Sequence, residues 1–187
     1  MRPITWIGAL LCSALAVSAQ DKPAEMKPQK EHEALKQFEG RWDVKCKWMM
    51  PGKAPEENTA TEASRVGFGG FWLVGDFRGE FDKKPFHGHS MTGYDPQTKK
   101  YVTFCFGSMM PDMKKFEGEA DPSGKKWTFK GDVTDPATGK NVPHRLVWEF
   151  TDKDHRTEKV FILDDGKETL VGEFTYTRRA GKPAESK

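Results

Sequence analysis

Alternating apolar and polar side chains are the feature that most constrains the fold of this chain. Between Trp42 and Trp48 every second residue is apolar, and every residue between them is charged. Successive side chains of a β-strand point to opposite faces, so this spacing predicts a strand with one buried and one solvated face. Similar segments recur as far as Arg178. We therefore expect about ten strands, at residues 41–50, 58–67, 70–80, 86–94, 99–107, 113–120, 125–132, 142–151, 156–164 and 169–178.

The segments between the expected strands are short and rich in turn-forming residues. Three of them begin with Asp-Pro, at Asp95, Asp121 and Asp135, and a fourth contains Asp165-Gly166. An aspartate carboxylate accepts hydrogen bonds from the following backbone, and proline presets the φ angle of a turn. Short connections join antiparallel strands, and no segment is long enough for the helical crossover that parallel strands need. A meander of this length forms either two stacked sheets or a closed barrel, and closure removes exposed edges.

One short helix is expected before the first strand. Leu35 and Phe38 lie three residues apart and so share one face of a helix over residues 31–38, which Gly40 ends. The expected fold class is all-β: an antiparallel up-and-down barrel of about ten strands, with the short N-terminal helix closing one end. A barrel of more than about eight strands is wide enough to enclose a cavity.

The first residues follow the three-part order of a secretory signal peptide. Met1-Arg2 is positively charged, residues 4–17 are apolar or small, and Val17-Ser18-Ala19 places small residues before a cleavage site. We expect a signal peptide at 1–19, cleaved after Ala19, and hence a secreted or periplasmic protein; a retained membrane anchor is the alternative. The expected remainder is a disordered linker at 20–30, a single barrel domain at 31–178 and a flexible tail at 179–187.

Composition excludes several classes of partner. The 30 lysine and arginine residues nearly balance the 28 aspartate and glutamate residues, which gives a formal net charge of +2. A dedicated nucleic-acid-binding protein carries a clustered basic excess instead. The mean hydropathy of −0.75 and the 31% of charged residues argue against an integral membrane segment in the mature chain. Monomer and dimer both remain open.

Two cysteines, Cys46 and Cys105, fall within expected strands. A disulfide is permitted in the oxidising compartments outside the cytoplasm. Buried free thiols are the simpler interpretation of two cysteines inside strands, and we favour them over a bridge.

Several motifs in a fixed order resemble a known family. Gly40-Arg41-Trp42 resembles the Gly-x-Trp start of the lipocalins and other calycin barrels, in which the tryptophan packs across the helix-side end of the barrel. Further matches are His32-Glu33-x-Leu35, Gly69-Gly70-Phe71-Trp72-Leu73, Pro85-Phe86-x-Gly88, Gly93-Tyr94-Asp95-Pro96 and Gly118-x-x-Asp121. Over residues 31–178 the chain resembles the uncharacterised, commonly exported bacterial family catalogued as domain of unknown function 1579.

This resemblance implies a calycin-like barrel and no established reaction. It implies structural roles for Gly40, Trp42, Gly93, Asp95 and Pro96. The common form of the family carries a tryptophan and an aspartate where Cys105 and Gly107 stand in this chain, so no role of that pair is carried over.

The expected strand at 86–94 places Ser90, Thr92 and Tyr94 on one face. Small and hydroxyl side chains that face inward leave room for a ligand, and tryptophan rings stack on aromatic molecules. His144 alternates with Leu146 and Trp148 and so shares their face. We interpret the barrel as a binder of a small hydrophobic or aromatic molecule, with candidate ligand-binding residues Trp72, Ser90, Thr92, Tyr94, His144 and Trp148.

Histidines provide the alternative of a metal site. His87 and His89 are two residues apart on one strand, so their side chains point to the same face and can chelate a metal ion. The third ligand would be His144 or His155 if the fold brought either one close, and the competing interpretation is a solvated outer face. In haem-binding relatives of the calycins an interior histidine ligates iron, a role that His144 would take here. No motif for covalent haem attachment is present, and we expect no cofactor.

No constellation of catalytic residues is recognisable. The serines occur outside any Gly-x-Ser-x-Gly frame, and no glycine-rich phosphate loop enters a helix. We therefore name no catalytic residue. The remaining alternative function is a non-catalytic structural or interaction protein of the cell envelope.

Overall fold

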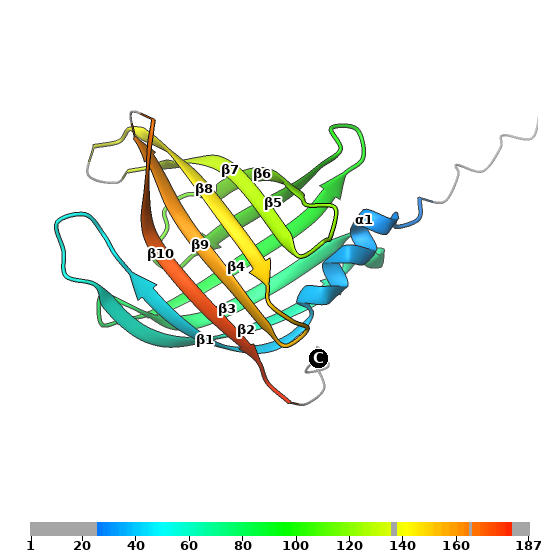
Figure 1. Ribbon diagram of the computed structural model, residues 1–187, viewed down its shortest axis with the longest axis horizontal. Helices are drawn as coiled ribbons and strands as arrows, with labels where there is room; N and C mark the ends of the chain where they lie inside the picture. Colours follow the sequence, from blue (N-terminus) through cyan, green and yellow to red (C-terminus); the bar gives the residue numbers. More distant parts are fainter. Residues whose placement is uncertain (1–25, 136–137, 165, 181–187) are drawn as a thin grey trace, which may run out of the picture.

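A computed structural model describes residues 26–135, 138–164 and 166–180. Within these residues ten antiparallel strands close into a barrel with the neighbour order β1-β10-β9-β8-β7-β6-β5-β4-β3-β2 (Figure 1). Their bounds are β1 Gly40–Trp48, β2 Glu56–Gly67, β3 Trp72–Phe81, β4 Lys84–Asp95, β5 Lys100–Gly107, β6 Lys114–Ala120, β7 Lys126–Thr134, β8 Asn141–Phe150, β9 His155–Asp164 and β10 Lys167–Arg178. The expected all-β barrel is confirmed. The expected signal peptide lies outside the described residues.

The barrel closes where the first strand meets the last. β1 pairs with β2 from Gly40 opposite Ser64 onward, and with β10 from Trp42 opposite Arg178 onward. The alternation along β1 is realised, because Trp42, Val44 and Cys46 are buried and the charged residues between them lie on the outer face. A closed sheet leaves no unpaired strand edge, which removes a template for aggregation.

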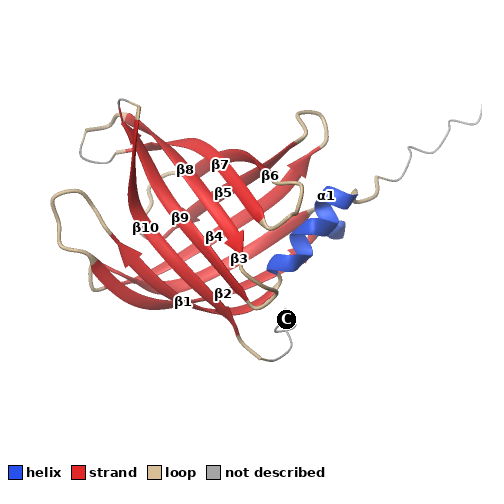
Figure 2. Cartoon of the chain, in the orientation of Figure 1, coloured by secondary structure: helices blue, strands red, loops and turns tan. Residues whose placement is uncertain are grey.

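A helical segment covers one end of the barrel (Figure 2). It consists of one α-helical turn, α1 Lys30–Glu33, followed by the 3-10 helix η1 Ala34–Phe38. Leu35 and Phe38 are 0% and 1% exposed, so the apolar face of the segment is buried against the barrel. The indole N–H of Trp42 donates to the carbonyl of Phe38 at 3.0 Å. The guanidinium of Arg178 donates to two further carbonyls at the end of η1, which ties the helical segment to β10.

The turns use the chemistry expected of Asp-Pro sequences. Asp121 accepts hydrogen bonds from the backbone N–H groups of Lys126 at 3.0 Å and Lys125 at 3.1 Å. These bonds favour the ionised carboxylate and hold its pKa below the ordinary value. Gly124 closes the turn with a φ of +69°, a conformation that glycine adopts without strain.

Aromatic side chains fill the barrel beneath the helical segment. Phe38 packs edge-on against Trp127 and Phe150, with ring centroids 5.1 Å and 4.8 Å apart. Trp42 and Trp127 are both 0% exposed. Edge-to-face pairs of this kind add about 0.5–1.5 kcal/mol each to area burial. The packed core therefore occupies the helix end and leaves the interior further along the barrel for other uses.

Both cysteines of the barrel are free thiols, in agreement with the preferred interpretation. Cys46 is buried, and Cys105 is half-buried. Burial raises the pKa of each thiol to about 12, so both carry their proton at neutral pH. Among the described residues, no helix has the length and hydropathy needed to cross a membrane.

Candidate functional site

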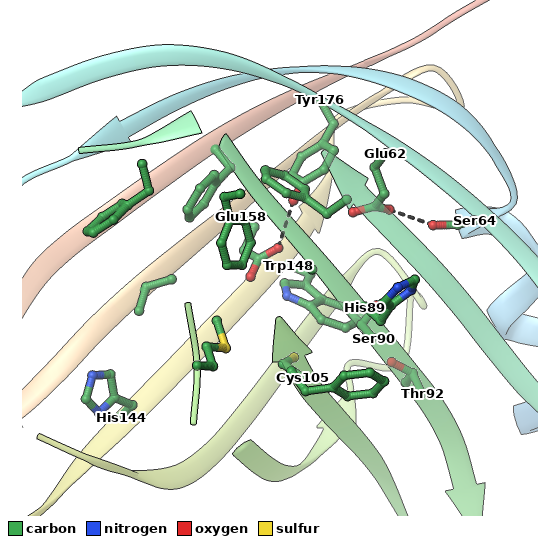
Figure 3. Close-up of a pocket in the computed structure, with 18 of the residues that line it drawn as sticks. Glu62, Ser64, His89, Ser90, Thr92, Cys105, His144, Trp148, Glu158 and Tyr176 are labelled. Carbon is green, nitrogen blue, oxygen red and sulfur yellow. Dashed lines mark hydrogen bonds between the residues drawn. The ribbon is translucent and has the colours of Figure 1, made fainter. Parts of the chain in front are cut away.

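A cavity of about 420 Å³ lies inside the barrel, on the far side of the aromatic core from the helical segment. Figure 3 shows side chains from several strands pointing into it. Most of its wall is apolar and includes Trp48, Leu73, Phe77, Phe86, Val160 and Phe174. A concave, mainly apolar surface with few polar groups is typical of a small-molecule site.

Small side chains on three neighbouring strands create the space. Ser64 on β2, Gly75 on β3 and Ser90 on β4 are direct neighbours across the sheet. A Cβ atom at Gly75 would lie 2.5 Å from the Oγ of Ser90. The neighbouring side chains therefore leave no room for a residue larger than glycine at this position. Larger residues here would fill the barrel, as they do at the helix end.

Methionines surround the open end of the cavity. Met50 lies in the loop after β1, and Met109 and Met110 lie in the loop after β5. All three border the cavity, and their exposed fractions are 37%, 42% and 38%. Methionine is unbranched and polarizable, so it adapts to differently shaped apolar partners. The entrance is therefore apolar and deformable.

The floor of the cavity is polar and charged. Arg156 on β9 is 3% exposed, and its Nη2 atom lies 2.7 Å from Oε1 of Glu62 on β2. The hydroxyl of Ser64 donates to the same Oε1 atom at 2.6 Å. The guanidinium carbon of Arg156 stands 3.4 Å from the ring centroid of Tyr176 and 5.1 Å from that of Trp42, so aromatic faces cover the buried cation.

Glu158 is a second carboxylate beside this pair. It follows Arg156 by two residues on β9 and therefore faces the same interior, where it borders the cavity. The hydroxyl of Tyr176 donates to its Oε2 atom at 3.1 Å (Figure 3). Burial raises the pKa of Glu158, and the nearby charge of Arg156 only partly offsets this effect. The indole N–H of Trp148, whose residue pairs with Glu158 across the sheet, is buried and also favours the ionised form of Glu158.

The structure brings four of the six expected ligand-binding residues to the cavity: Ser90, Thr92, His144 and Trp148. Thr92 is 1% exposed, and its hydroxyl donates to that of Thr103 at 2.9 Å.

Trp72 and Tyr94 are not among the residues that line the cavity. Trp72 is adjacent to the inward-facing Leu73, so its side chain points to the outer face, where its ring covers Gly93. Tyr94 has the inward parity, but it sits near the end of β4. There its ring lies 5.7 Å from that of His32 in α1, beneath the helical segment.

His144 lies toward the open end of the cavity, because β8 runs from Asn141 at that end to Phe150 under the helix. Its Nδ1 atom is 2.7 Å from the carbonyl oxygen of Val142. A bond of this kind orients an imidazole and directs its other nitrogen away. The side chain can therefore offer one nitrogen to a bound molecule.

His87 and His89 lie beside Asp76 of β3, and His89 also borders the cavity (Figure 3). The Oδ2 atom of Asp76 lies 3.1 Å from Nε2 of His87 and 3.7 Å from Nδ1 of His89. Ligand atoms of the three residues lie within 4.8 Å of one another, which suits two imidazoles and a carboxylate around one metal ion. The third partner is thus Asp76, and neither His144 nor His155 joins the pair.

The candidate residues predicted from the sequence do not include the charged floor. Its members are Glu62, Arg156, Glu158 and Tyr176. The signal was present on β9, where Arg156 and Glu158 alternate with Thr157 and share the parity of Val160 and Ile162. Two charged residues in register with an apolar strand face indicate a buried ion pair or a binding site.

The residues expected to be structural occupy helix-end positions. Trp42 packs under the helical segment, and Asp95 caps a turn by accepting from the backbone N–H of Gln97 at 2.9 Å. Pro96 follows Asp95 in this turn. Gly40 has a φ of +130°, where a side chain would be strained and would meet Arg178.

Fold and cavity together define a class of protein: a closed antiparallel barrel of the calycin type, with a helical plug at one end and an internal pocket. Within this class the chain belongs to the protein family of unknown function DUF1579, whose profile matches residues 27–178. A comparison with curated proteins gives no match.

Two solved structures share the fold. Rv2717c from M. tuberculosis superposes with a TM-score of 0.60 at 14% identity, over 81% of this chain and 98% of its own. The S-type phycobiliprotein lyase CPES from Guillardia theta superposes with a TM-score of 0.54 at 13% identity, over 83% of this chain and 100% of its own. Identities this low show a common barrel fold.

Proposed function

We propose that this protein binds a small hydrophobic or aromatic molecule inside its barrel. The observation that carries the proposal is the cavity of about 420 Å³, with an apolar wall and a charged floor. Sites for small molecules measure roughly 300–1,000 Å³ and place a few polar groups in an apolar wall. The phycobiliprotein lyase among the structural neighbours supports a ligand-related role for a barrel of this shape.

A neutral fluorescent probe, N-phenyl-1-naphthylamine, tests the proposal. Its emission should rise on binding to the full-length protein, and binding should raise the melting temperature. Ser90→Leu places a larger side chain opposite Gly75 and should weaken probe binding by about tenfold or more. Thr175→Leu is the matched control, because Thr175 is an exposed residue on the outer face of β10.

Two results would contradict the proposal. One is the absence of probe binding to the folded wild-type protein. The other is equal affinity of the Ser90→Leu and Thr175→Leu variants, with both variants shown to be folded by thermal unfolding.

A second candidate function is metal binding on the barrel wall, favoured by the convergence of Asp76, His87 and His89. Isothermal titration of the full-length protein with Zn²⁺ should show one site, and His89→Ala should weaken it by about tenfold or more. His155→Ala is the control, because that exposed histidine lies elsewhere and contacts Asp152. Equal Zn²⁺ affinity of the two variants would exclude this site.

We also propose that the protein acts outside the cytoplasm, as residues 1–19 suggest. Expression in a bacterial host, followed by mass spectrometry of the periplasmic fraction, should find a chain that begins at Gln20. A full-length chain confined to the cytoplasm, or one held in the membrane fraction, would contradict this proposal.

A further inference from the structure

When Glu158 is ionised, the carboxylates and guanidinium of the cavity floor do not balance in charge. Among the described residues that line the cavity, two are carboxylates, Glu62 and Glu158, and one is a guanidinium, Arg156. Arg156 is bound to Glu62 at 2.7 Å, and both side chains are largely buried. An interior of low dielectric strongly favours equal numbers of opposite charges.

Glu158 is the group left without a cation. No lysine, arginine or histidine among the described residues forms an ion pair with it. The Tyr176 hydroxyl donates to it at 3.1 Å, and the Trp148 side chain also favours its ionised form. Its residue is half-buried, and it borders the cavity inside the barrel. The carboxylate is therefore accessible to a molecule in the cavity and shielded from bulk water.

Aromatic rings flank this carboxylate. Trp148 on β8 and Phe174 on β10 are its cross-strand neighbours, and both rings border the cavity. Their π faces attract cations, most strongly where water is excluded. The indole N–H of Trp148 is buried and interacts with the Glu158 carboxylate, whose ionised form it favours.

We propose that the ligand of this cavity is an amphipathic organic cation, in which an apolar or aromatic body carries one ammonium group that pairs with Glu158. This inference rests on the proposed binding function and names its ligand class. An ammonium group beside Glu158 would bring the floor to two positive and two negative charges. A carboxylate ligand would instead add a third negative charge beside Arg156, whose guanidinium is already engaged by Glu62.

The titratable groups around Glu158 come from several strands. They are Cys46 on β1, Glu62 on β2, Cys105 on β5, Arg156 on β9 and Tyr176 on β10. Burial raises the pKa of Glu158, so below that pKa the empty cavity holds a neutral carboxyl group. Binding of an ammonium group then releases this proton. The affinity for an amine should therefore rise with pH through the titration of Glu158, whereas that for a neutral alcohol should not.

Three molecules with one common body test the inference: 4-phenylbutylamine, 4-phenylbutanol and 4-phenylbutyric acid. Each competes with N-phenyl-1-naphthylamine for the full-length protein at about pH 7. We expect the amine to bind about tenfold tighter than the alcohol and the acid to bind weakest. Glu158→Gln should remove the preference for the amine over the alcohol. Glu173→Gln should change nothing, because Glu173 faces outward on β10 beside Lys159.

The outcomes separate the two proposals. Equal binding of the three molecules, tightest binding of the acid, or an unchanged amine preference in Glu158→Gln would overturn the ligand class while leaving a binding cavity in place. Failure of all three molecules and of the naphthylamine probe to bind would overturn the binding function itself. Thermal unfolding of each variant confirms that a lost preference reflects the site rather than lost structure.

Discussion

At the scale of single residues, the buried Arg156–Glu62 pair is the most consequential contact in the barrel. The two side chains are 4% and 14% exposed and 2.7 Å apart. A buried charge without an oppositely charged partner costs far more free energy than a buried ion pair. The pair therefore links β2 to β9 across the interior, and its two members should be treated as one unit.

Removing one member of this pair should be more harmful than removing both. We expect Arg156→Leu to lower the free energy of unfolding by about 3–5 kcal/mol, because Glu62 remains buried without a partner. The double variant Arg156→Leu/Glu62→Leu should recover most of this loss. Urea denaturation of the single and double variants measures the difference. A double variant less stable than Arg156→Leu would show that the pair itself is strongly stabilising.

Glu158 should leave a signature in the pH dependence of stability. Burial raises the folded-state pKa of Glu158 above the ordinary value of 4.5. At pH values between 4.5 and the raised pKa, the folded chain therefore binds more protons than the unfolded chain. The free energy of unfolding contributed by this group is greatest below about 4.5 and falls as pH rises through the raised pKa.

Glu158→Gln should lack this decline, since an amide does not titrate. The measurement is the difference in unfolding free energy between wild type and Glu158→Gln, taken from about pH 4 to pH 8. Subtraction cancels the carboxylates with lowered pKa values, such as Asp95 and Asp121, whose contributions run in the opposite direction. A difference that stays constant with pH would contradict the raised pKa.

At the scale of elements, the helical segment acts as a plug whose apolar face is set by Leu35 and Phe38. Phe38 contacts the rings of Trp127, Trp148 and Phe150 and also borders the cavity floor. It therefore separates the aromatic core from the binding space.

Phe38→Ala should destabilise the protein and enlarge the cavity. We expect a loss of about 3–5 kcal/mol in the free energy of unfolding, as for other buried phenylalanines. Thermal and urea unfolding check the stability, and the naphthylamine probe reports the change in cavity size. Lys36→Ala, on the exposed face of the same segment, is the control and should stay within about 0.5 kcal/mol of wild type. A similar small effect of Phe38→Ala would contradict its role as a plug.

Element type and order were predictable because the period of two is strong and the turns are chemically distinct. The expected strand over 99–107 and the observed β5 Lys100–Gly107 differ by one residue at one end. Whether a side chain points into the barrel was predictable from its position in the alternation along the strand. The aromatic ring of Trp72 suggests contact with a ligand, but its neighbour Leu73 holds the inward position on β3. The position of the Tyr94 side chain depends on how far the helical segment reaches into the barrel. No local sequence pattern indicates that distance.

The floor of the cavity depends on contacts between distant parts of the chain, and this explains why the candidate residues omitted it. Glu62 and Arg156 are 94 residues apart, and nothing in either local segment indicates the other. Asp76 joins the two histidines in the same way, through the β3–β4 register. Local alternation therefore predicts the wall of this barrel, whereas partners across the sheet follow only from the register of the closed structure.

At the scale of the whole molecule, stability depends on the seam between β1 and β10. Along this seam Trp42 pairs with Arg178, and Arg179 contacts Asp43 beyond it. Every other neighbouring pair of strands is joined by a short connection, so the seam is the one pairing that requires the two ends of the described chain to meet.

Truncation should show this dependence directly. A chain ending at Asp164 lacks β10 and exposes both β1 and β9 as edges, so we expect it to lose its cooperative thermal transition. A chain ending at Ala180 keeps all ten strands and should melt like the full-length protein. Far-ultraviolet circular dichroism during heating distinguishes them. A cooperative transition in the shorter chain would show that an open nine-strand sheet is stable alone.

The seam also sets the timing of folding during synthesis. β10, the partner of β1 at the seam, is synthesised after the other nine described strands. The nascent chain can therefore form hairpins in order but cannot close the barrel until translation has passed Arg178. Throughout elongation, β1 presents a bare edge to whatever factor accompanies the nascent chain. Closure of the barrel therefore requires every strand from β1 to β10 to be available.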